Sequence, residues 1–360
     1  MSFKELPYPD VIETIEYEAI LNKNKLIFKE YLNEAEYELL ESDRFAALLQ
    51  AISYREVILR SRINSSVKSM LLRFATGRDL DNKAAEQDVY RLKGAKPTAN
   101  IEFSLSSTRS TDTYLQKGLI LRDDKDAVAL LKEDVIIEAN SLKAIGVIEF
   151  QEYTKQSNKK CEYIQTPLPF LLKAKQLTIF ENGAEIEDDE RLRERAFLSP
   201  KGLSTAGSED SYIYHTLTSN VKVEEVKIEN GGAGVVNIYI KTPLLDEDTR
   251  KDVENYINDK KRRTFTDYVH VINATEHQIQ IKAELEIIDM FRENEIYQKI
   301  EAYNKRLGLG VDLNLSHIYS LLHCEGVYRV NLETPTLDTK VNSNEFISIF
   351  FDLSFKKALL

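Results

Sequence analysis

The feature that most constrains this chain is a stretch, 43–76, that contains neither proline nor glycine and is rich in apolar residues. Because these two residues most disfavour a helix interior, their absence predicts one continuous helix on the order of 50 Å long. Ser42 or Asp43 can cap its first turn, and Gly77 can end it in the left-handed conformation. Such a helix is longer than a small globular core needs, so we expect it to act as a beam in an assembly.

Apolar positions on this helix recur in steps of three and four, the spacing of a helix packed against other helices. The seam consists of Phe45, Leu49, Ile52, Glu56, Leu59, Ile63, Ser66 and Met70. Further apolar positions widen the surface, so we expect several neighbouring helices, some of them from other chains. Glu56 either points out at a bend or pairs with an arginine across the bundle, because a buried unpaired carboxylate is costly. The arginines among these positions either join the interface or extend to solvent from an ordinary bundle.

Four blocks of sequence resemble the Baseplate J-like proteins of contractile-tailed bacteriophages, in the order in which that family carries them. The first is LPYPDVIETIEYEAIL near the N-terminus, and the second is SDRFAALLQAISYREVILRSRIN with the following LLRFATGRDLDNKAA. The third is ERLRERAFLSPKGLSTAGSEDSYIYHTLT at 190–218, and the fourth is RRTFTDYVHVINA at 262–274. Four blocks in order make the resemblance far more specific than one block alone.

The resemblance implies a structural part in a baseplate wedge. Family members assemble with further copies of themselves, with a smaller wedge protein similar to tail protein I, and with other baseplate components. The resemblance also implies that 43–76 and 190–218 form a helix bundle shared between chains and that 221–360 mediates self-contact. The implied location is the host cytoplasm during assembly and then the baseplate of the virion tail. The residues expected at the bundle interface are Leu49, Ile52, Arg55, Glu56, Leu59, Arg62, Ile63 and Met70.

The order of the predicted elements indicates a multidomain α+β protein. We expect a long-helix bundle at 1–88, and a β-sandwich or partial barrel at 89–188, where short Ile-, Val- and Phe-rich segments alternate with polar turns. The predicted strands there are IEFSLS, GLILRD, DVIIEA, AIGVIEF and KQLTIFEN. Helices return at 189–220, and we expect them to pack against the long helix. Two small α+β units, 221–288 and 289–360, each predict helices on an antiparallel sheet.

Capping and turn residues locate several of these elements. Asp188 or Asp189 can begin one helix of the returning segment, and Ser208 can begin the next. ENGGAG predicts a hairpin, and Asp246 with Asp248 predicts a helix start.

Charge and composition exclude several function classes. The chain of 360 residues carries a net charge of −11, which argues against general nucleic-acid binding because that needs a basic face. No signal-peptide pattern and no run of eighteen apolar residues is present, so we expect neither export by such a peptide nor a membrane span. Cys161 and Cys324 form no metal spacing and predict two free thiols in a reducing cytoplasm.

The sequence offers little that predicts catalysis. It lacks HExxH, GxSxG, P-loop and CxxC patterns, so we expect no catalytic residue, no cofactor and no metal, and hence no enzyme. His270 and His277 flank a predicted turn and could approach each other, but without a carboxylate cluster they make a poor metal site. Asp123, Asp124 and Asp126 predict a polar turn, since the rest of a calcium loop is missing.

One alternative of another class stays open. A receptor- or glycan-binding tail protein would use the β-rich region as its binding face. Such a face needs exposed aromatic side chains, and the region offers Tyr114, Tyr153 and Tyr163 but no tryptophan. A cell-wall hydrolase would need paired carboxylates or a zinc triad, and neither pattern is present. The informative features are apolar helices, which favours a scaffold.

Overall fold

The computed structural model describes residues 3–33, 39–40, 43–165, 168, 170–203, 207–259, 262–288, 293–304 and 307–358. The chain folds into two compact units. Unit 1 contains Met1–Arg91 and Asp188–Phe197, and unit 2 contains Leu92–Glu187 and Leu198–Leu360. The chain therefore leaves unit 1 after Arg91, builds the β-rich region, and returns to unit 1 at Asp188.

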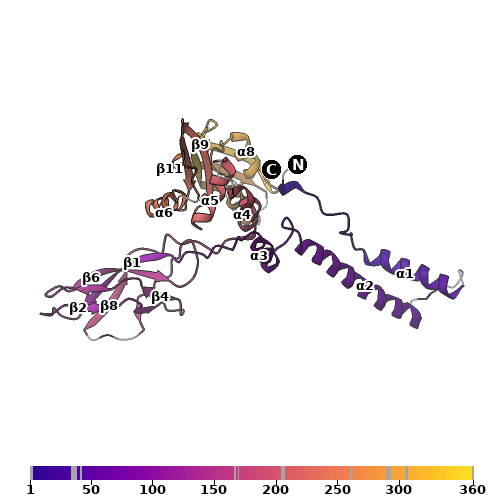
Figure 1. Ribbon diagram of the computed structural model, residues 1–360, viewed down its shortest axis with the longest axis horizontal. Helices are drawn as coiled ribbons and strands as arrows, with labels where there is room; N and C mark the ends of the chain where they lie inside the picture. Colours follow the sequence, from indigo (N-terminus) through magenta and orange to yellow (C-terminus); the bar gives the residue numbers. More distant parts are fainter. Residues whose placement is uncertain are drawn as a thin grey trace. The chain divides into compact units, whose positions relative to one another are not determined.

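Unit 1 is helical. It consists of the short 3-10 helix Phe3–Glu5, α1 (Tyr17–Leu32), α2 (Arg44–Ser69), α3 (Gly77–Ala85) and the first part of α4 (Asp189–Gly202). Helices α1 and α2 pack side by side as a hairpin (Figure 1). The predicted cap of the long helix is confirmed, because the Asp43 carboxylate accepts a hydrogen bond from the Phe45 amide at 2.9 Å. The other candidate cap, Ser42, lies outside the described residues.

The long helix is shorter than predicted. Its 26 residues end at Ser69, which corresponds to about 39 Å. The chain continues in short turns, with the Phe74 and Ala75 amides both donating to the Leu71 carbonyl. Gly77 has a φ of 54°, as predicted, but it opens α3 and does not end α2. Tertiary contacts described below hold this turn, and they override the local helix preference.

The β-rich region forms one core from eight strands: β1 (Thr98–Leu105), β2 (Thr113–Leu115), β3 (Ile120–Arg122), β4 (Val128–Leu131), β5 (Val135–Ile137), β6 (Lys143–Phe150), β7 (Tyr163–Ile164) and β8 (Leu171–Gln176). Six of them form a sheet in the order β7-β3-β4-β6-β1-β8, and β2 pairs with β5. Alternate residues of β1 point inward, as a half-buried strand requires. The core includes Ile101, Phe103, Leu121, Ile137, Ile148, Phe150 and Phe180.

The large sheet curls toward closure, as a partial barrel does. Strands β7 and β8 stand at opposite ends of the strand order, yet they contact each other. Gln176 bridges the gap, because its side-chain oxygen accepts from the Cys161 backbone amide at 3.0 Å and its backbone amide donates to the Glu162 carboxylate at 3.0 Å. The predicted strand KQLTIFEN is wrong over most of its length, since β8 ends at Gln176, and the strands β2, β4 and β7 were not predicted.

The next part of unit 2 begins with α5 (Glu209–Ser219), β9 (Glu225–Gly232), β10 (Val235–Lys241), α6 (Glu247–Ile257) and β11 (Tyr268–Asn273). Ser208 and Asp246 cap α5 and α6, as predicted. Within unit 2, α5 packs on α6 and β9, where Tyr212 and Leu217 join a core with Ile238 and Val253. Strands β9, β10 and β11 form a sheet in the order β11-β10-β9, and Figure 1 shows α5 and α6 beside it.

The last part contains β12 (Thr275–Ile287), α7 (Glu293–Asn304), α8 (Leu315–Leu322), β13 (Val327–Thr334) and β14 (Glu345–Lys357). Its sheet has the order β13-β12-β14. Because β12 is the central strand of this sheet, the two small units divide near Ala274 and not at 288. The expectation of antiparallel sheets is wrong for both units, since β10 pairs with β11, and β12 with β14, in parallel.

Two further points concern the whole described chain. None of its helices has the length and apolar character that crossing a membrane requires. Cys161 and Cys324 are both buried and carry free thiols.

Candidate assembly interface

The α1–α2 hairpin has a small internal core. Ile20 and Leu21 of α1 and Leu49 of α2 are buried, and the rings of Phe28 and Phe45 lie 5.4 Å apart near the closed end. A row of polar contacts runs beside this core. The Asn24 side-chain amide donates to the Ser53 hydroxyl and to the Glu56 carboxylate, each at 3.0 Å.

Glu56 is therefore satisfied inside the chain. Besides the Asn24 bond, it accepts bonds from the Arg60 guanidinium on its own helix at 2.6 and 2.9 Å. The hydrogen bond from Asn24, together with Arg60, holds the pKa of the Glu56 carboxyl below its usual range. Glu56 thus pairs with an arginine as expected, but along the helix and not across a bundle.

The N-terminal segment covers a second side of α2. The Asn64 side-chain amide donates to the Glu13 carbonyl at 2.8 Å, and the Glu13 carboxylate lies 2.5 Å from the Arg60 guanidinium. Nearer the end of α2, the Tyr8 and Phe74 rings lie 4.7 Å apart and the Lys68 ammonium lies over the Tyr8 ring. Residues before α1 consequently occupy surface that another chain could otherwise use.

One apolar strip of α2 stays about half exposed in the described chain. We call it the α2 stripe, and its members are between 47% and 69% exposed: Phe45, Leu48, Ile52, Leu59, Ile63 and Met70. Their spacing of three, four and seven places them on one side of the helix, next to the side that faces α1. A continuous strip of this kind is uncommon on a monomer and indicates a binding surface.

Two exposed arginines border the α2 stripe. Arg55 and Arg62 lie seven residues apart, roughly 10 Å along the helix axis. Neither guanidinium has a carboxylate within ion-pair distance among the residues that the structure describes. Arg60 differs from both, because its guanidinium forms ion pairs with Glu13 and Glu56 inside the chain.

The structure sorts the eight predicted interface residues into two groups. Leu49 and Glu56 face α1, so they hold the hairpin together. The other six lie exposed on or beside the α2 stripe: Ile52, Arg55, Leu59, Arg62, Ile63 and Met70. Phe45 and Leu48 belong to the same surface; Phe45 is a predicted seam position, but neither residue is among the eight predicted interface residues.

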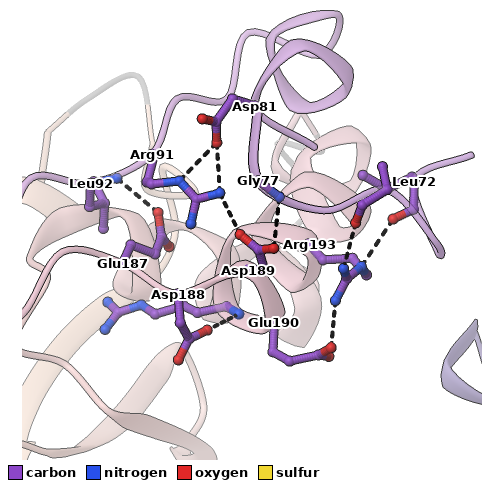
Figure 2. Close-up of polar contacts among 12 residues, drawn as sticks. Leu72, Gly77, Asp81, Arg91, Leu92, Glu187, Asp188, Asp189, Glu190 and Arg193 are labelled. Carbon is purple, nitrogen blue, oxygen red and sulfur yellow. Dashed lines mark hydrogen bonds and ion pairs between the residues drawn. The ribbon is translucent and has the colours of Figure 1, made fainter. Parts of the chain in front are cut away.

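Beyond the hairpin, unit 1 contains a polar cluster that the sequence did not predict (Figure 2). Arg91 lies between two carboxylates, 2.7 Å from Asp81 and 2.7 Å from Asp189. The Asp189 carboxylate also accepts a bond from the Gly77 amide at 2.8 Å. That backbone bond and the Arg91 guanidinium hold the pKa of Asp189 below its usual range. The cluster joins the starts of α3 and α4.

Arg193 ties α4 to the turn that follows α2. Its guanidinium donates to the Leu72 carbonyl at 3.0 Å and to the Ala75 carbonyl at 2.7 Å, and it pairs with Glu190 at 2.6 Å. Because only 5% of Arg193 is exposed, it satisfies carbonyls that water cannot easily reach. The only sequence signal was the charge-rich run at 188–195, which resembles any solvated helix face.

The two crossings between the units are held together on each side. In unit 1 the Arg91–Asp189 pair joins the outgoing and returning chain. In unit 2 the Leu92 amide donates to the Glu187 carboxylate at 2.8 Å, and the Glu187 amide donates to the Leu92 carbonyl at 3.2 Å (Figure 2). The β-rich region is therefore an insertion whose two ends lie side by side.

The described residues show no catalytic constellation. His270 lies on β11 and packs against the Tyr268 ring, whereas His277 lies on β12, 3.4 Å from Glu345, so the two histidines belong to different sheets. No group of three metal-ligating side chains occurs among the described residues. Asp123 caps a polar turn by accepting from the Lys125 and Ala127 amides, as predicted.

Two other features could have pointed to ligand binding. A hollow of about 480 Å³ borders the β9–β10 hairpin, where the Tyr212 hydroxyl donates to Asp267 at 2.7 Å. The exposed tyrosines of the β-rich region come from three separate segments: Tyr114 on β2, Tyr153 after β6 and Tyr163 on β7. Neither feature brings together the groups that a specific glycan or catalytic site needs.

Comparison with known proteins gives this geometry a context. Residues 41–95 match the family model described as "Baseplate J-like N-terminal domain", which covers α2, the following turn and α3. Baseplate protein J of Escherichia phage P2 is 26% identical over 361 residues, covering 96% of this chain and 94% of that protein. The chain is thus similar to a phage baseplate protein over nearly its whole length, and to the Baseplate J-like family model in its N-terminal part. The α2 stripe lies within the segment that matches this family model.

A solved structure aligns over a similar length. A chain in the cryo-EM structure of the anti-feeding prophage baseplate is 10% identical, with a TM-score of 0.43, over 96% of this chain and 95% of that chain. This likeness is too low to support an inference.

Proposed function

We infer that this chain is a structural component of the baseplate of a contractile phage tail. Full-length similarity to a phage baseplate protein J supports this function. The observation that carries it on the structural side is the α2 stripe, an apolar surface that stays about half exposed in the segment matching the Baseplate J-like N-terminal domain. The role is a scaffold and needs no enzyme activity.

The α2 stripe serves as one wall of a helix bundle shared between chains. Its six side chains are each about half exposed, so a partner helix can bury a further apolar strip along most of α2. The side of α2 that faces α1 is already filled, which leaves this strip as the docking direction. A hairpin with one free apolar side is the geometry that a multi-chain bundle requires.

The positive charges beside the α2 stripe indicate which side chains the partner helix should carry. Arg55 and Arg62 flank the α2 stripe, and neither pairs with a carboxylate of the described residues, so the partner helix is expected to carry carboxylates about seven residues apart beside its apolar seam. The partners we propose are a second copy of this chain and a smaller wedge protein similar to tail protein I. Assembly takes place in the host cytoplasm, and the product is part of the virion baseplate.

The mechanism of such a component is mechanical. The polar cluster around Arg91 and Asp189 and the Arg193 contacts fix the turn after α2, so a load on the helix hairpin passes into α3 and α4 without loosening that joint. The self-contacts of 221–360 would then link neighbouring wedges into a ring around the hub.

The test is the solution mass of the full chain, alone and co-expressed with the product of the neighbouring smaller tail gene, measured by light scattering after gel filtration. The expected result is a defined hetero-complex that contains two copies of this chain. A chain that elutes apart from its neighbour, whether as a monomer or as a dimer, would overturn the shared-bundle function.

A further inference from the structure

The last strand, β14, is an unprotected sheet edge. In the order β13-β12-β14, β14 pairs with β12 along thirteen residues, from Glu345 to Lys357. No other strand of the described chain lies on its outer side. Long edge strands are a risk that proteins normally reduce by bulges, proline or a cover, because free backbone groups attract another strand.

The backbone of β14 shows which groups are free. The Ala358 amide donates to Ile287 of β12, and the Asn344 carbonyl accepts from Thr275 at the start of β12. Backbone N–H and C=O groups alternate in direction along a strand. Those of the even-numbered residues of β14 therefore point toward β12, and those of the odd-numbered residues point away from it, along the free edge.

The first half of this outer edge is occupied and the second half is not. The Glu345 carbonyl accepts from the Gly310 amide at 2.8 Å, and the Ile349 carbonyl accepts from the Asn304 side chain at 3.4 Å. Beyond Ile349, no described residue bonds to the outward backbone groups. The free positions are Phe351, Leu353, Phe355 and Lys357.

The side chains of these positions add an apolar strip. Phe351, Leu353 and Phe355 lie on the face that carries the core, opposite buried residues of β12, yet they are only half-buried. The core of this small sheet therefore ends in incompletely covered apolar groups at the same edge where the backbone is free. A further strand that continues the sheet would both bond the free backbone groups and cover the apolar side chains.

We propose that β14 of one chain pairs antiparallel with β14 of a second copy, with Ser354 at the two-fold axis. Leu353 then lies opposite Phe355 of the other copy, in a hydrogen-bonded position, and their side chains extend the core. On the opposite face Asp352 lies opposite Lys356 of the other copy, twice by symmetry. The strand is thus self-complementary in backbone, apolar face and charge.

Neighbouring registers lack this agreement. If the axis lay midway between two residues, a side chain on the core face of one copy would lie opposite a side chain on the other face of the second copy. The alternation of side chains along the strand excludes that register. An axis at Leu353 places Asp352 opposite Ser354, and an axis at Phe355 places it opposite Ala358, so both lose the ion pairs. The pairing rests on the proposed function only in deepening the self-contact of 221–360, and it uses no residue of α2.

The test uses charge reversal in the full chain, in an Ile63→Asp background that disables the α2 stripe. Asp352→Lys and Lys356→Asp are purified separately, and self-association is measured by sedimentation velocity over a concentration series. Each variant alone replaces two ion pairs by two like-charge pairs, so its dimerisation is expected to weaken about tenfold or more. Mixing the two variants recreates both ion pairs and is expected to restore a heterodimer, as is the double swap in a single chain.

Two results would overturn the proposal. One is self-association of either single variant at the wild-type strength; the other is a mixture that remains monomeric although thermal melts show both variants folded. Failure here leaves the co-expressed complex intact, whereas failure of the shared bundle leaves the β14 dimer intact, so the two can be told apart. Leu353→Pro is an independent check: of the backbone groups it removes only the outward amide of residue 353, a loss tolerated at a sheet edge, and it is expected to weaken self-association.

Discussion

Replacing Ile63 by aspartate tests the α2 stripe most directly. Ile63 lies in the C-terminal half of the α2 stripe and is 56% exposed in the chain by itself. Isoleucine and aspartate have similar helix propensities, so the substitution costs the isolated chain only about 0.3 kcal/mol. The melting temperature of the uncomplexed variant is therefore expected to change by about 1 °C.

The cost appears only when a partner covers the stripe. Complete burial of an isoleucine contributes about 1.5–3 kcal/mol. Because Ile63 is 56% exposed in the chain alone, roughly half of that free energy is gained only when a partner covers it. An aspartate in the same dry seam must also lose its water without gaining a cation, which costs several kcal/mol. Together these terms reach about 4 kcal/mol, which corresponds to about a thousandfold increase in Kd.

The assay is co-purification followed by titration of the partner against the wild-type chain and each variant. Ser65→Asp is the matched control, because Ser65 lies two residues away on α2, is exposed and points away from the stripe. Wild-type affinity is expected for the control. If Ile63→Asp assembles as tightly as Ser65→Asp, the α2 stripe is not the interface.

Three further outcomes follow from contacts inside the chain. Arg193→Met leaves the buried carbonyls of the turn unsatisfied and should lower the unfolding free energy of unit 1 by about 2–4 kcal/mol in urea. Gly146→Ala places a methyl 2.7 Å from Val135 in the β-rich core, so a loss of about 1–3 kcal/mol is expected in the same assay. Asp189 has a lowered pKa in the folded chain, so its stabilisation is complete above the unfolded value of 3.8 and is lost as pH falls through the folded value. Asp189→Asn should remove that acid-dependent part of an unfolding curve recorded below about pH 5, whereas an unchanged slope would contradict the role of Arg91 and Gly77.

Local sequence rules located many elements correctly. Asp43, Ser208 and Asp246 begin helices because their side chains accept orphan amides of the first turn, a contact that needs only neighbouring residues. Alternation and turn residues located several strands for the same reason. The same rules overestimated the long helix, because nothing near 70–76 disfavours a helix locally; the turn there depends on Arg193, which lies about 120 residues away in sequence.

The sequence also could not predict which distant strands and helices pair with each other. Periodicity cannot show that β12 leaves its neighbour β11 and joins β13 and β14, since a strand has the same pattern in either sheet. It also cannot separate residues that a helix uses for its own hairpin from residues left for a partner. Leu49 and Ile63 share one seam in sequence, yet Leu49 is 7% exposed and Ile63 is 56% exposed.

The sequence by itself determined the resemblance to the Baseplate J-like family, through its four sequence blocks. It also determined the order of helical and β-rich regions and the existence of a long amphipathic helix, because these depend on composition and on spacing along one element. Only the tertiary structure decided where the beam ends, that Glu56 is satisfied by Asn24 and Arg60, and which strip of α2 and which edge of β14 remain uncovered. Those outcomes depend on which distant groups meet. A surface becomes available for assembly only after the chain has used the rest for its own fold.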